Sequence, residues 1–398
     1  MRTYSPIDAV VSVASNSPYT PTGYGQQTGY LVERLVRHGI NTAVLSNFGL
    51  EGQLSTIRTK HGKVAHYPRG LSLYSDDVLP AHHRHHRAGR EDKPHAVITL
   101  YDAWVYKNPE LKDIPFISWT PIDHVTLPPA VAQWLQRENV TPISMAPHGQ
   151  RLLEAANIPS TYIPHGIDTR IYDYTEHWSD GVKTRRMMEA DEDTFVIGMV
   201  AANKANQVLH RKALAENFLA VALFMKSRPN VKLYIHSEPG IAYGGFNLPH
   251  LLQAVGINPD NVVFTDPMQL RYGYTAKEMA SLYSAFDVLL ATSYGEGFGI
   301  PTVEAQACGT RAIASGWAAS QDLVSEDSWL VDGFEFWDEA QRSWWKIPSV
   351  PSIVKALEIA YEADRGPSEI ARNFALGFDV DTVWHEHWAP FLKGYFAR

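Results

Sequence analysis

Short apolar runs alternate with amphipathic helical patterns along this 398-residue chain, and this alternation limits the folds open to it. It predicts parallel sheets with helices on both faces, because successive parallel strands need a crossover that is usually helical. The length suggests two or three domains at about 150 residues each. We therefore expect an α/β protein with two doubly wound, Rossmann-like domains. The expected strands are residues 9–14, 42–46, 95–100, 115–119 and 142–145 in the first half, and 194–200, 231–236, 262–265, 287–292 and 311–315 in the second.

Composition excludes several classes of protein. Hydrophobic residues make up 45% of the chain and charged residues 20%, and no run of about eighteen apolar residues offers a membrane-spanning helix. The N-terminus lacks the apolar block of a signal peptide, and the one cysteine, Cys308, allows neither an intramolecular disulfide nor a cysteine metal cluster. We therefore expect a cytoplasmic protein. A net charge of -8 argues against a protein that grips a nucleic-acid backbone over a broad basic face.

The segment from Ser293 to Gly309 carries the most chemistry. It reads Ser-Tyr-Gly-Glu-Gly-Phe-Gly-Ile-Pro-Thr-Val-Glu-Ala-Gln-Ala-Cys-Gly, with carboxylates at Glu296 and Glu304. Pro301 suits the first helical position and Gly309 suits a left-handed stop. The segment therefore predicts a glycine-rich loop followed by a helix over residues 301–308.

The loop before this helix is suited to a phosphate group. The backbone amides of Gly297, Phe298 and Gly299 would face outward at the positive end of the helix dipole. The two glutamates would repel phosphate, but each is suited to accept hydrogen bonds from hydroxyl groups. The pattern fits a molecule with a diphosphate in the middle and a polyol at each end, as in a nucleotide sugar. The alternative is a solvated loop acid at Glu296 and a first-turn acid at Glu304 that complements the dipole.

This segment resembles the Glu-x7-Glu motif of retaining GT-B glycosyltransferases of family 4, the glycosyl transferases group 1. The resemblance implies that Glu296 contacts the transferred sugar and Glu304 the ribose. It also implies two Rossmann-like domains that face a central cleft, and a front-face mechanism in which the leaving diphosphate helps to deprotonate the acceptor. No enzymic nucleophile is then required.

A basic pair follows the first expected strand of the second half. Family 4 enzymes carry an arginine and a lysine in this loop to neutralise the donor diphosphate, and Arg211 and Lys212 match the variant in which the two are adjacent. Asn203 stands about where the commoner pattern has its arginine, so we include it among the donor contacts. A solvated helix start is the other interpretation. Because these cations can stabilise the leaving group and no convincing Asp-x-Asp motif occurs, we expect no metal and no cofactor beyond a UDP- or GDP-linked sugar.

The domain boundary is expected near residues 163–172. This stretch resembles the Pro-Asn-Gly-Val-Asp segment of the family, with His165 where asparagine is often found, and Gly166 would allow a positive φ in a tight turn. We therefore expect an acceptor domain over 1–170 and a donor domain over 171–378. The resemblance implies that the C-terminal helix, 379–398, packs back on the first domain.

Two further groups are candidates for the site. Asp123 and His124 follow an expected strand, at the sheet edge where α/β proteins collect reactive residues, and family 4 enzymes place such residues near the sugar and the acceptor hydroxyl. A structural turn is as good an interpretation for Asp123. Tyr272 and Tyr274 precede a helix beside which the family binds the nucleotide base. Either tyrosine would stack on the base or serve as a core aromatic.

The glycine-rich stretch after the first strand contains Gly23 and Gly25, with a helix expected over 30–38. Its spacing, Gly-x-Gly-x-x-x-Gly, differs from the dinucleotide fingerprint, and no acid closes the second strand near Ser46, which argues against an NAD enzyme. In GT-B enzymes the corresponding loop approaches the diphosphate or the acceptor. A simple tight turn is the alternative.

Four histidines and three arginines crowd residues 82–90, which we expect to form a loop. A solvated loop, a lid over the acceptor and adventitious metal capture are the three interpretations, and no carboxylate within the run completes a metal site.

The sequence leaves the acceptor open: a glycan, a lipid-linked sugar, a protein, a small molecule or, at the margin, a modified base in DNA. A GT-B phosphorylase, a nucleotide-sugar epimerase and a non-catalytic nucleotide-sugar binding protein are the alternatives to a glycosyltransferase.

Overall fold

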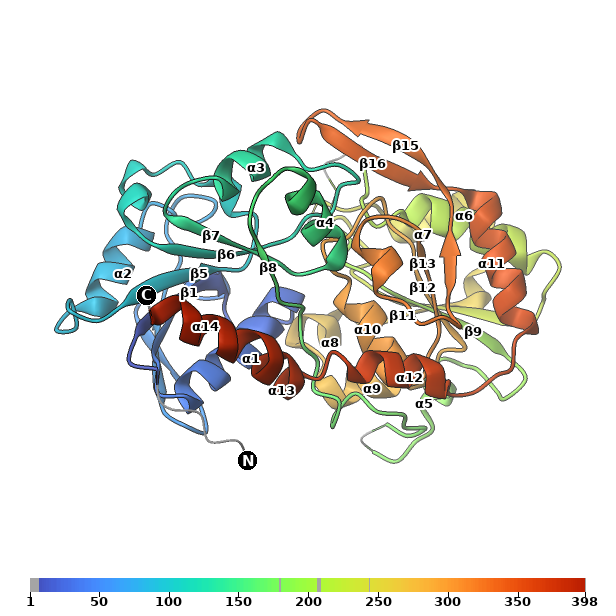
Figure 1. Ribbon diagram of the computed structural model, residues 1–398. Coiled ribbons are helices and arrows are strands. Elements are labelled where there is room, and N and C mark those ends of the chain that lie inside the picture. The colour runs from blue at the N-terminus through green and yellow to red at the C-terminus, as the bar shows by residue number, and fades with distance from the viewer. Residues whose placement is uncertain (1–6, 179, 206–208, 243, 398) are drawn as a thin grey trace. The chain divides into compact units, whose positions relative to one another are not determined.

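The computed structural model describes residues 7–178, 180–205, 209–242 and 244–397 of the chain. The chain forms two compact units (Figure 1). The first takes in the chain up to Ile122, then Leu127–Gly166 and the C-terminal segment from Val380. The second consists of Asp123–Thr126 and Ile167–Asp379. The four-residue segment Asp123–Thr126 thus belongs to the second unit, although its neighbours in sequence belong to the first.

The first unit is built on an eight-stranded sheet in the order β3-β4-β2-β1-β5-β6-β7-β8. Every neighbouring pair is parallel except β3 and β4, which are antiparallel. Such sheets are buried on both faces, so their strands read as nearly continuous apolar runs. The strands are β1 (Val10–Asn16), β2 (Asn41–Phe48), β3 (Ser55–Arg58), β4 (Lys63–Tyr67), β5 (His95–Thr99), β6 (Phe116–Thr120), β7 (Val140–Ser144) and β8 (Thr161–Tyr162).

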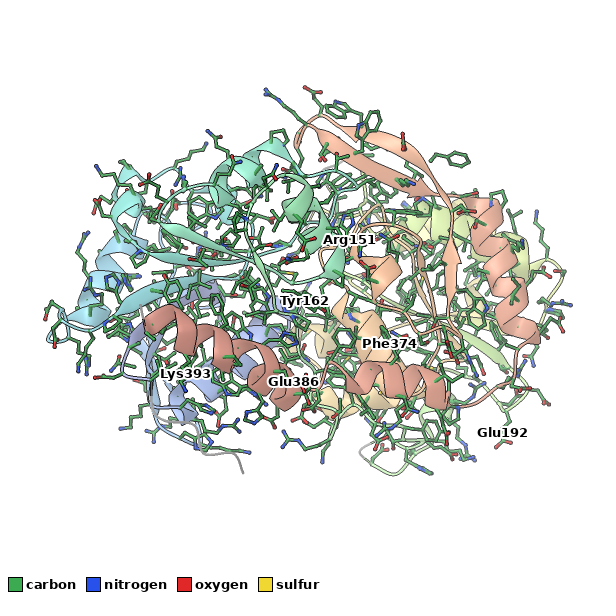
Figure 2. All side chains as sticks on the ribbon, in the orientation of Figure 1. Arg151, Tyr162, Glu192, Phe374, Glu386 and Lys393 are labelled. Carbon is green, nitrogen blue, oxygen red and sulfur yellow. The ribbon has the colours of Figure 1, made fainter. Side chains whose placement is uncertain are left out.

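The helices of the first unit include one segment from the far end of the chain. Arg34 of α1 pairs with Asp381 at 2.8 Å, and Trp384 is fully buried. Tyr162 packs edge-on against His387, next to the labelled Glu386 (Figure 2). The helices are α1 (Gly23–Arg37), α2 (Leu79–Arg87), α3 (Pro129–Leu135), α4 (Pro147–Ala155), α13 (Val380–Val383) and α14 (Ala389–Phe396), with 3-10 turns at Ala103–Val105 and Pro109–Asp113 and a π-helical turn at Trp384–Trp388.

The second unit is built on a six-stranded parallel sheet in the order β11-β10-β9-β12-β13-β14. Its strands are β9 (Phe195–Val200), β10 (Val231–His236), β11 (Val262–Phe264), β12 (Val288–Ala291), β13 (Ala312–Ser315) and β14 (Trp329–Val331). Its helices are α5 (Thr184–Met187), α6 (Leu214–Met225), α7 (Leu248–Val255), α8 (Pro267–Tyr272), α9 (Ala276–Ser284), α10 (Ile300–Ala307), α11 (Val350–Glu362) and α12 (Glu369–Leu376), with 3-10 turns at Pro259–Asn261 and Ala318–Asp322. A separate antiparallel hairpin joins β15 (Gly333–Asp338) to β16 (Ser343–Pro348).

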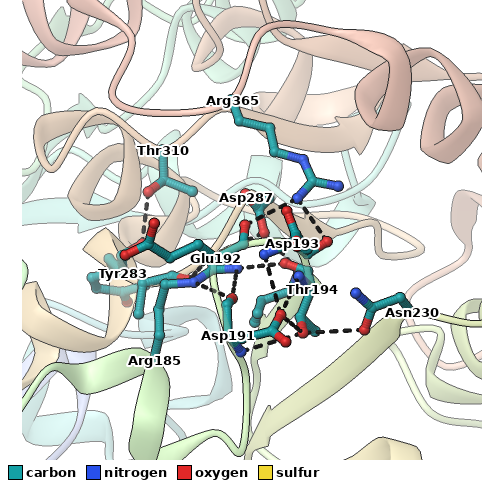
Figure 3. A network of polar contacts seen from close by, with 12 residues as sticks. Arg185, Asp191, Glu192, Asp193, Thr194, Asn230, Tyr283, Asp287, Thr310 and Arg365 are labelled. Atoms are coloured by element: carbon teal, nitrogen blue, oxygen red, sulfur yellow. Dashed lines mark hydrogen bonds and ion pairs between the residues drawn. The ribbon is translucent and has the colours of Figure 1, made fainter.

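A polar network fixes the start of the second sheet (Figure 3). Arg185 of α5 pairs with Asp287 at 3.1 Å, and the same carboxylate oxygen accepts the backbone N–H of Val196 at 2.7 Å. Arg365 donates to the carbonyl oxygen of Asp193 at 2.9 Å. These contacts anchor β9 and β12 side by side, and the loops that leave both strands at the opposite end carry the candidate site.

The expected fold of two doubly wound domains is confirmed, and each of the ten expected strands is present within two residues of its predicted bounds. The short strands β3, β4, β8 and β14 and the β15–β16 hairpin were not predicted.

The prediction of a loop over residues 82–90 is wrong, because most of this stretch lies in α2. His83 and His86 lie three positions apart on the buried face of the helix. Ser12 of β1 lies 2.9 Å from Nδ1 of His83 and 3.0 Å from Nδ1 of His86. His83 also bonds to His95 at 3.0 Å, and His86 to Asn41 at 2.6 Å. Polar partners on β1, β2 and β5 therefore make this histidine-rich sequence a packed helix.

The prediction that a helix begins at residue 30 is also wrong, since α1 begins at Gly23. The hydroxyl of Thr22 caps it by accepting the N–H of Gly25 at 3.1 Å. A Cβ on Gly25 would lie 2.4 Å from Oγ1 of Thr20, so this position needs glycine for close packing inside the helix.

Gly166 likewise serves close packing rather than the predicted positive φ. A Cβ there would lie 2.8 Å from the Cα of Val380, and φ of Gly166 is not in the left-handed region. The amide of Gln27 bonds to both the N–H and the carbonyl oxygen of Gly166.

Candidate functional site

The glycine-rich loop after β12 leads into α10. The helix runs from Ile300 to Ala307, one residue earlier than predicted. Gly299 caps it with φ of +106° and Gly309 follows it with φ of +81°, so both positions favour glycine. The ring of Phe298 is buried and packs edge-on against Phe378. The packing of Phe298 and the left-handed backbone of Gly299 therefore fix the conformation of the loop that contains Gly297.

The predicted cations meet the first glutamate of this loop. The loop after β9 carries Arg211 and Lys212, and β9 neighbours β12 in the sheet. Nη1 of Arg211 lies 3.0 Å from Oε2 of Glu296, and Nζ of Lys212 lies 2.5 Å from Oε1. Arg211 also donates to the carbonyl oxygen of Gly295 and accepts the N–H of Tyr294 on its own carbonyl oxygen. Two cations thus share one carboxylate where the two strand ends meet.

The protonation states follow from burial and charge together. Burial would raise the pKa of Glu296, but the charges of Arg211 and Lys212 outweigh it and hold the pKa below its ordinary value. Burial lowers the pKa of Lys212, and the charge of Glu296 opposes this only in part. The pKa values of both groups are thus lowered, that of Glu296 by its cationic neighbours and that of Lys212 by burial.

Asp123 joins this group from an unexpected side. We expected Asp123 in the first domain, but it packs in the second unit. Its Oδ2 lies 3.7 Å from Nε of Arg211. A Cβ on Gly295 would lie 1.8 Å from the carbonyl oxygen of Asp123, so the two backbones touch here and position 295 admits only glycine. Burial would raise the pKa of Asp123, but His124 and Arg211 outweigh it and lower the pKa.

His124 is held between two carboxylates. Its Nδ1 lies 2.8 Å from Asp123, and its Nε2 lies 3.1 Å from Asp338 of β15. The ring stacks on Trp345 of β16 with centroids 4.6 Å apart. Burial would lower the pKa of His124, but the carboxylates of Asp123 and Asp338 outweigh it and raise the pKa. The two carboxylates therefore favour the protonated imidazole, an arrangement that sequence reasoning missed because it depends on the hairpin.

Glu304 lies inside the second unit, on the buried face of α10. The hydroxyl of Tyr283 on α9 donates to its Oε2 at 2.8 Å. Burial raises the pKa of the Tyr283 phenol, and the charge of Glu304 raises it further, so the hydroxyl stays protonated and donates.

The remaining predicted residues lie in three other settings. Asn203 is buried, and its amide bonds to the backbones of Glu238, Gly240 and Phe246, so it organises the loops around it. Tyr272 ends α8 and is 77% exposed. Tyr274 packs edge-on against His236, with centroids 4.9 Å apart. Gly23 and Gly25 belong to the first unit.

The structure therefore brings together Arg211, Lys212, Glu296, Asp123 and His124, and adds Asp338 and Trp345. Within the described ranges, no group of three or more histidine, cysteine or acidic side chains is placed to hold a metal ion. Among those same residues, no helix is both long and apolar enough to cross a membrane.

Part of the second unit is similar in sequence to a known protein family. Residues 195–341 match the model of the family "Glycosyl transferases group 1". A D-inositol 3-phosphate glycosyltransferase of Paenarthrobacter aurescens is 28% identical over 176 residues, which cover 43% of this chain and 38% of the relative. Another, from Arthrobacter sp., is 34% identical over 125 residues, 30% of this chain and 28% of the relative. The matches thus span less than half the length of these relatives.

The likeness to solved structures covers almost the whole chain. Sucrose-phosphate synthase from Thermosynechococcus elongatus aligns with a TM-score of 0.70 at 16% identity, over 98% of this chain and 100% of that one. HepE of Anabaena, solved with UDP and glucose, aligns with a TM-score of 0.60 at 17% identity, over 97% and 100%. At such identities the likeness is one of fold. Residues 195–341 of the second unit therefore match the glycosyl transferases group 1 family, and the chain as a whole has the GT-B fold.

Proposed function

We propose that this protein is a retaining glycosyltransferase that moves a sugar from a nucleotide-sugar donor to an acceptor hydroxyl without a metal ion. The observation that carries the proposal is the convergence of Arg211 and Lys212 on Glu296, beside the glycine-rich loop that opens α10. Cleavage of a sugar–phosphate bond builds negative charge on the leaving diphosphate. A fixed guanidinium and ammonium can stabilise that charge in a partly dehydrated site.

The roles follow from this arrangement. Arg211 and Lys212 bind the diphosphate, and the loop at Gly297, Phe298 and Gly299 offers it backbone amides. Once the diphosphate shares the two cations, the carboxylate of Glu296 can accept hydrogen bonds from the transferred sugar. Asp123 lies next to Arg211, and its side chain is 29% exposed, which leaves it accessible to a hydroxyl of the sugar or the acceptor.

The other donor contacts are assigned from the family resemblance. We propose that Glu304 accepts a hydrogen bond from the ribose and that Tyr272 or Tyr274 stacks on the base. The first unit would carry the acceptor, with Gly23 and Gly25 at the start of α1 as candidates for contact with it. The departing diphosphate would deprotonate the acceptor on the face from which it leaves, so retention needs no enzymic nucleophile.

The names of the similar proteins suggest where to search for the substrates. These names include D-inositol 3-phosphate and sucrose phosphate, and one of the structures was solved with UDP and glucose. Phosphorylated polyols and sugars are therefore the first acceptors to try, with UDP-glucose as the first donor.

A donor panel tests the proposal. We expect at least one UDP-, GDP- or dTDP-sugar to raise the melting temperature of the full chain and to be consumed slowly by hydrolysis, or faster with a phosphorylated polyol, with EDTA present throughout. Product anomers identified by NMR should keep the donor configuration. Failure of every donor to bind or react would contradict the proposal, and activity that EDTA abolishes would contradict the metal-free mechanism.

A further inference from the structure

Six charged side chains of the second unit form a line of alternating sign. Carboxylate and cation alternate with separations of 3.1, 2.8, 3.7, 3.0 and 2.5 Å. The order is Asp338, His124, Asp123, Arg211, Glu296 and Lys212. At neutral pH the line carries no net charge when His124 is protonated. Each side chain is thus held by the opposite charges of its neighbours. Removal of the charge at one end changes the electrostatic surroundings of the next side chain in the line.

Exposure varies along the line. The side chain of His124 is 2% exposed and that of Asp338 is 10% exposed, whereas Asp123 is 29% and Arg211 is 34% exposed. The first pair therefore lies beneath the second. Both nitrogens of His124 face carboxylates, and its ring lies against Trp345, whose π face favours a cation. These neighbours enclose the imidazole of His124, so we assign it no direct contact with a substrate.

The hairpin fixes this end of the line in place. The N–H of Val125 donates to the carbonyl oxygen of Trp344 at 2.7 Å, and the hydroxyls of Thr126 and Ser343 lie 2.8 Å apart. Asp338 pairs in register with Ser343, and its second oxygen accepts the N–H of Ala340 at 3.1 Å in the hairpin turn. The hairpin thus holds the Asp123–Thr126 segment by its backbone and the His124 ring by its charge.

We propose that Asp338 is a positioning residue for the transfer reaction, which through His124 holds Asp123 ionised and turned toward Arg211. The inference rests on the proposed function, since it assigns Arg211 to the leaving diphosphate. Asp338 touches no substrate in this account. The hairpin sets the position of the guanidinium through two intervening side chains.

The proposal has a pH signature. The groups that face His124 are Asp123 from its own segment, Asp338 from β15 and the neutral ring of Trp345 from β16, with Arg211 beyond Asp123. His124 must be protonated for the line to hold, so activity should fall on the alkaline side as it loses its proton. Removing the charge of Asp338 lowers the pKa of His124, because an opposite charge at this distance shifts a pKa by about one unit or more.

The test compares D338N with E335Q. Asparagine keeps an oxygen for the N–H of Ala340, and Glu335 lies on the same strand with an exposed side chain and the same charge. We expect the alkaline limb of the kcat/KM profile to lie about one pH unit lower in D338N than in the wild type, so that D338N is about tenfold slower on that limb. Near pH 6 the rate of D338N should stay within about threefold of the wild-type rate. E335Q should follow the wild-type profile, and D338E should restore much of the shift.

A ligand-free measurement separates this inference from the proposed function. In the full-length 15N-labelled protein, the imidazole of His124, assigned by comparison with H124Q, should titrate at a lower pH in D338N than in the wild type. Unchanged titration, or a D338N rate loss that is equal at every pH, would overturn the positioning role. A shifted titration in a protein that uses no nucleotide sugar would overturn the proposed function and leave the charge relation intact.

Discussion

Buried histidines occur in both units, but their surroundings differ in kind. In the first unit, His83 and His86 of α2 bond to Ser12, His83 also bonds to His95 of β5, and His86 bonds to Asn41; Ser12 and Asn41 are uncharged. In the second unit, His124 lies between two carboxylates. Burial disfavours the charged imidazole in both places. The partners therefore decide whether a buried histidine is neutral or charged.

The hydrogen bonds of His83, His86 and His95 can all form with the three imidazole rings neutral. Nε2 of His86 donates to Oδ1 of Asn41, so its Nδ1 accepts the hydroxyl proton of Ser12. The Ser12 oxygen accepts from Nδ1 of His83, whose Nε2 then accepts from Nδ1 of His95. Burial lowers the pKa of His83 to about 3 and those of His86 and His95 to about 4. A satisfied neutral network of this kind specifies packing.

The cluster of the second unit is arranged for the opposite purpose. Its charges balance only as a set, and the side chains of Arg211 and Lys212 are partly exposed. An anionic ligand can therefore take over the partners that the protein provides for itself. This contrast predicts that variants of the cluster lose turnover, whereas variants of the histidine network lose stability.

The largest expected effect is on the reaction. Lys212→Met removes the ammonium while Arg211 remains to pair with Glu296, so folding should survive. We expect kcat/KM to fall by about 10² to 10³, the usual loss when one donor to a developing anion is removed. Steady-state rates with the donor found in the panel measure it.

Lys226→Met supplies the matched control, because Lys226 is exposed just beyond the far end of α6. It should keep wild-type activity. A Lys212→Met protein that retains its rate within about threefold would contradict the diphosphate role.

The parts of the site that local sequence could predict lie at the ends of strands. Glu296, Arg211 and Lys212 follow β12 and β9, and the order of a parallel sheet brings such loops to one edge. Glycines with a left-handed backbone at 299 and 309 were predictable from the way helices begin and end. Neither inference needs knowledge of distant residues.

The parts that could not be predicted depend on long-range packing. Asp338 reaches His124 only because a hairpin more than 200 positions away docks on the Asp123–Thr126 segment. The alternation of residues 333–338 and 343–348 was a local signal for the hairpin, but nothing local gives its partner. The same holds for α2, where Ser12 and Asn41 turn an apparently solvated histidine run into a buried one.

A second prediction concerns pH, and the two regions should respond with opposite sign. The pKa values of His83, His86 and His95 lie below the unfolded value of 6.5, so their contribution is full above pH 6.5 and is lost as pH falls toward about 4. The pKa of His124 is raised, so its contribution is full below pH 6.5 and is lost as pH rises through the folded value. Each of the three histidines should cost the folded region about 2 kcal/mol of local stability between pH 6.5 and 4.5.

Hydrogen–deuterium exchange of peptides measures both slopes in one protein, after correction for intrinsic exchange rates. Peptides from β1 and α2 should lose protection on acidification, and peptides from the β15–β16 hairpin should lose it on the alkaline side. If protection changed with pH in the same direction in both regions, the hydrogen-bond and ion-pair partners would not determine the charge of the buried histidines.

The smallest expected effect isolates one hydroxyl of the neutral network. Ser12→Ala leaves Nδ1 of His83 and Nδ1 of His86 without their shared partner in a site that water does not reach. A buried polar group without a partner costs about 1 to 3 kcal/mol. The free energy of unfolding of the first unit, measured in urea, should therefore fall by about 2 kcal/mol. Ser160→Ala removes a half-buried hydroxyl that bonds to Gln150 of α4, and should cost less than about 0.5 kcal/mol. Turnover of Ser12→Ala at 20 °C should match the wild type, because the hydroxyl supports packing and is not one of the six charged side chains of the second unit. Loss of turnover in a folded Ser12→Ala protein would contradict the separation of a structural network in the first unit from a functional cluster in the second.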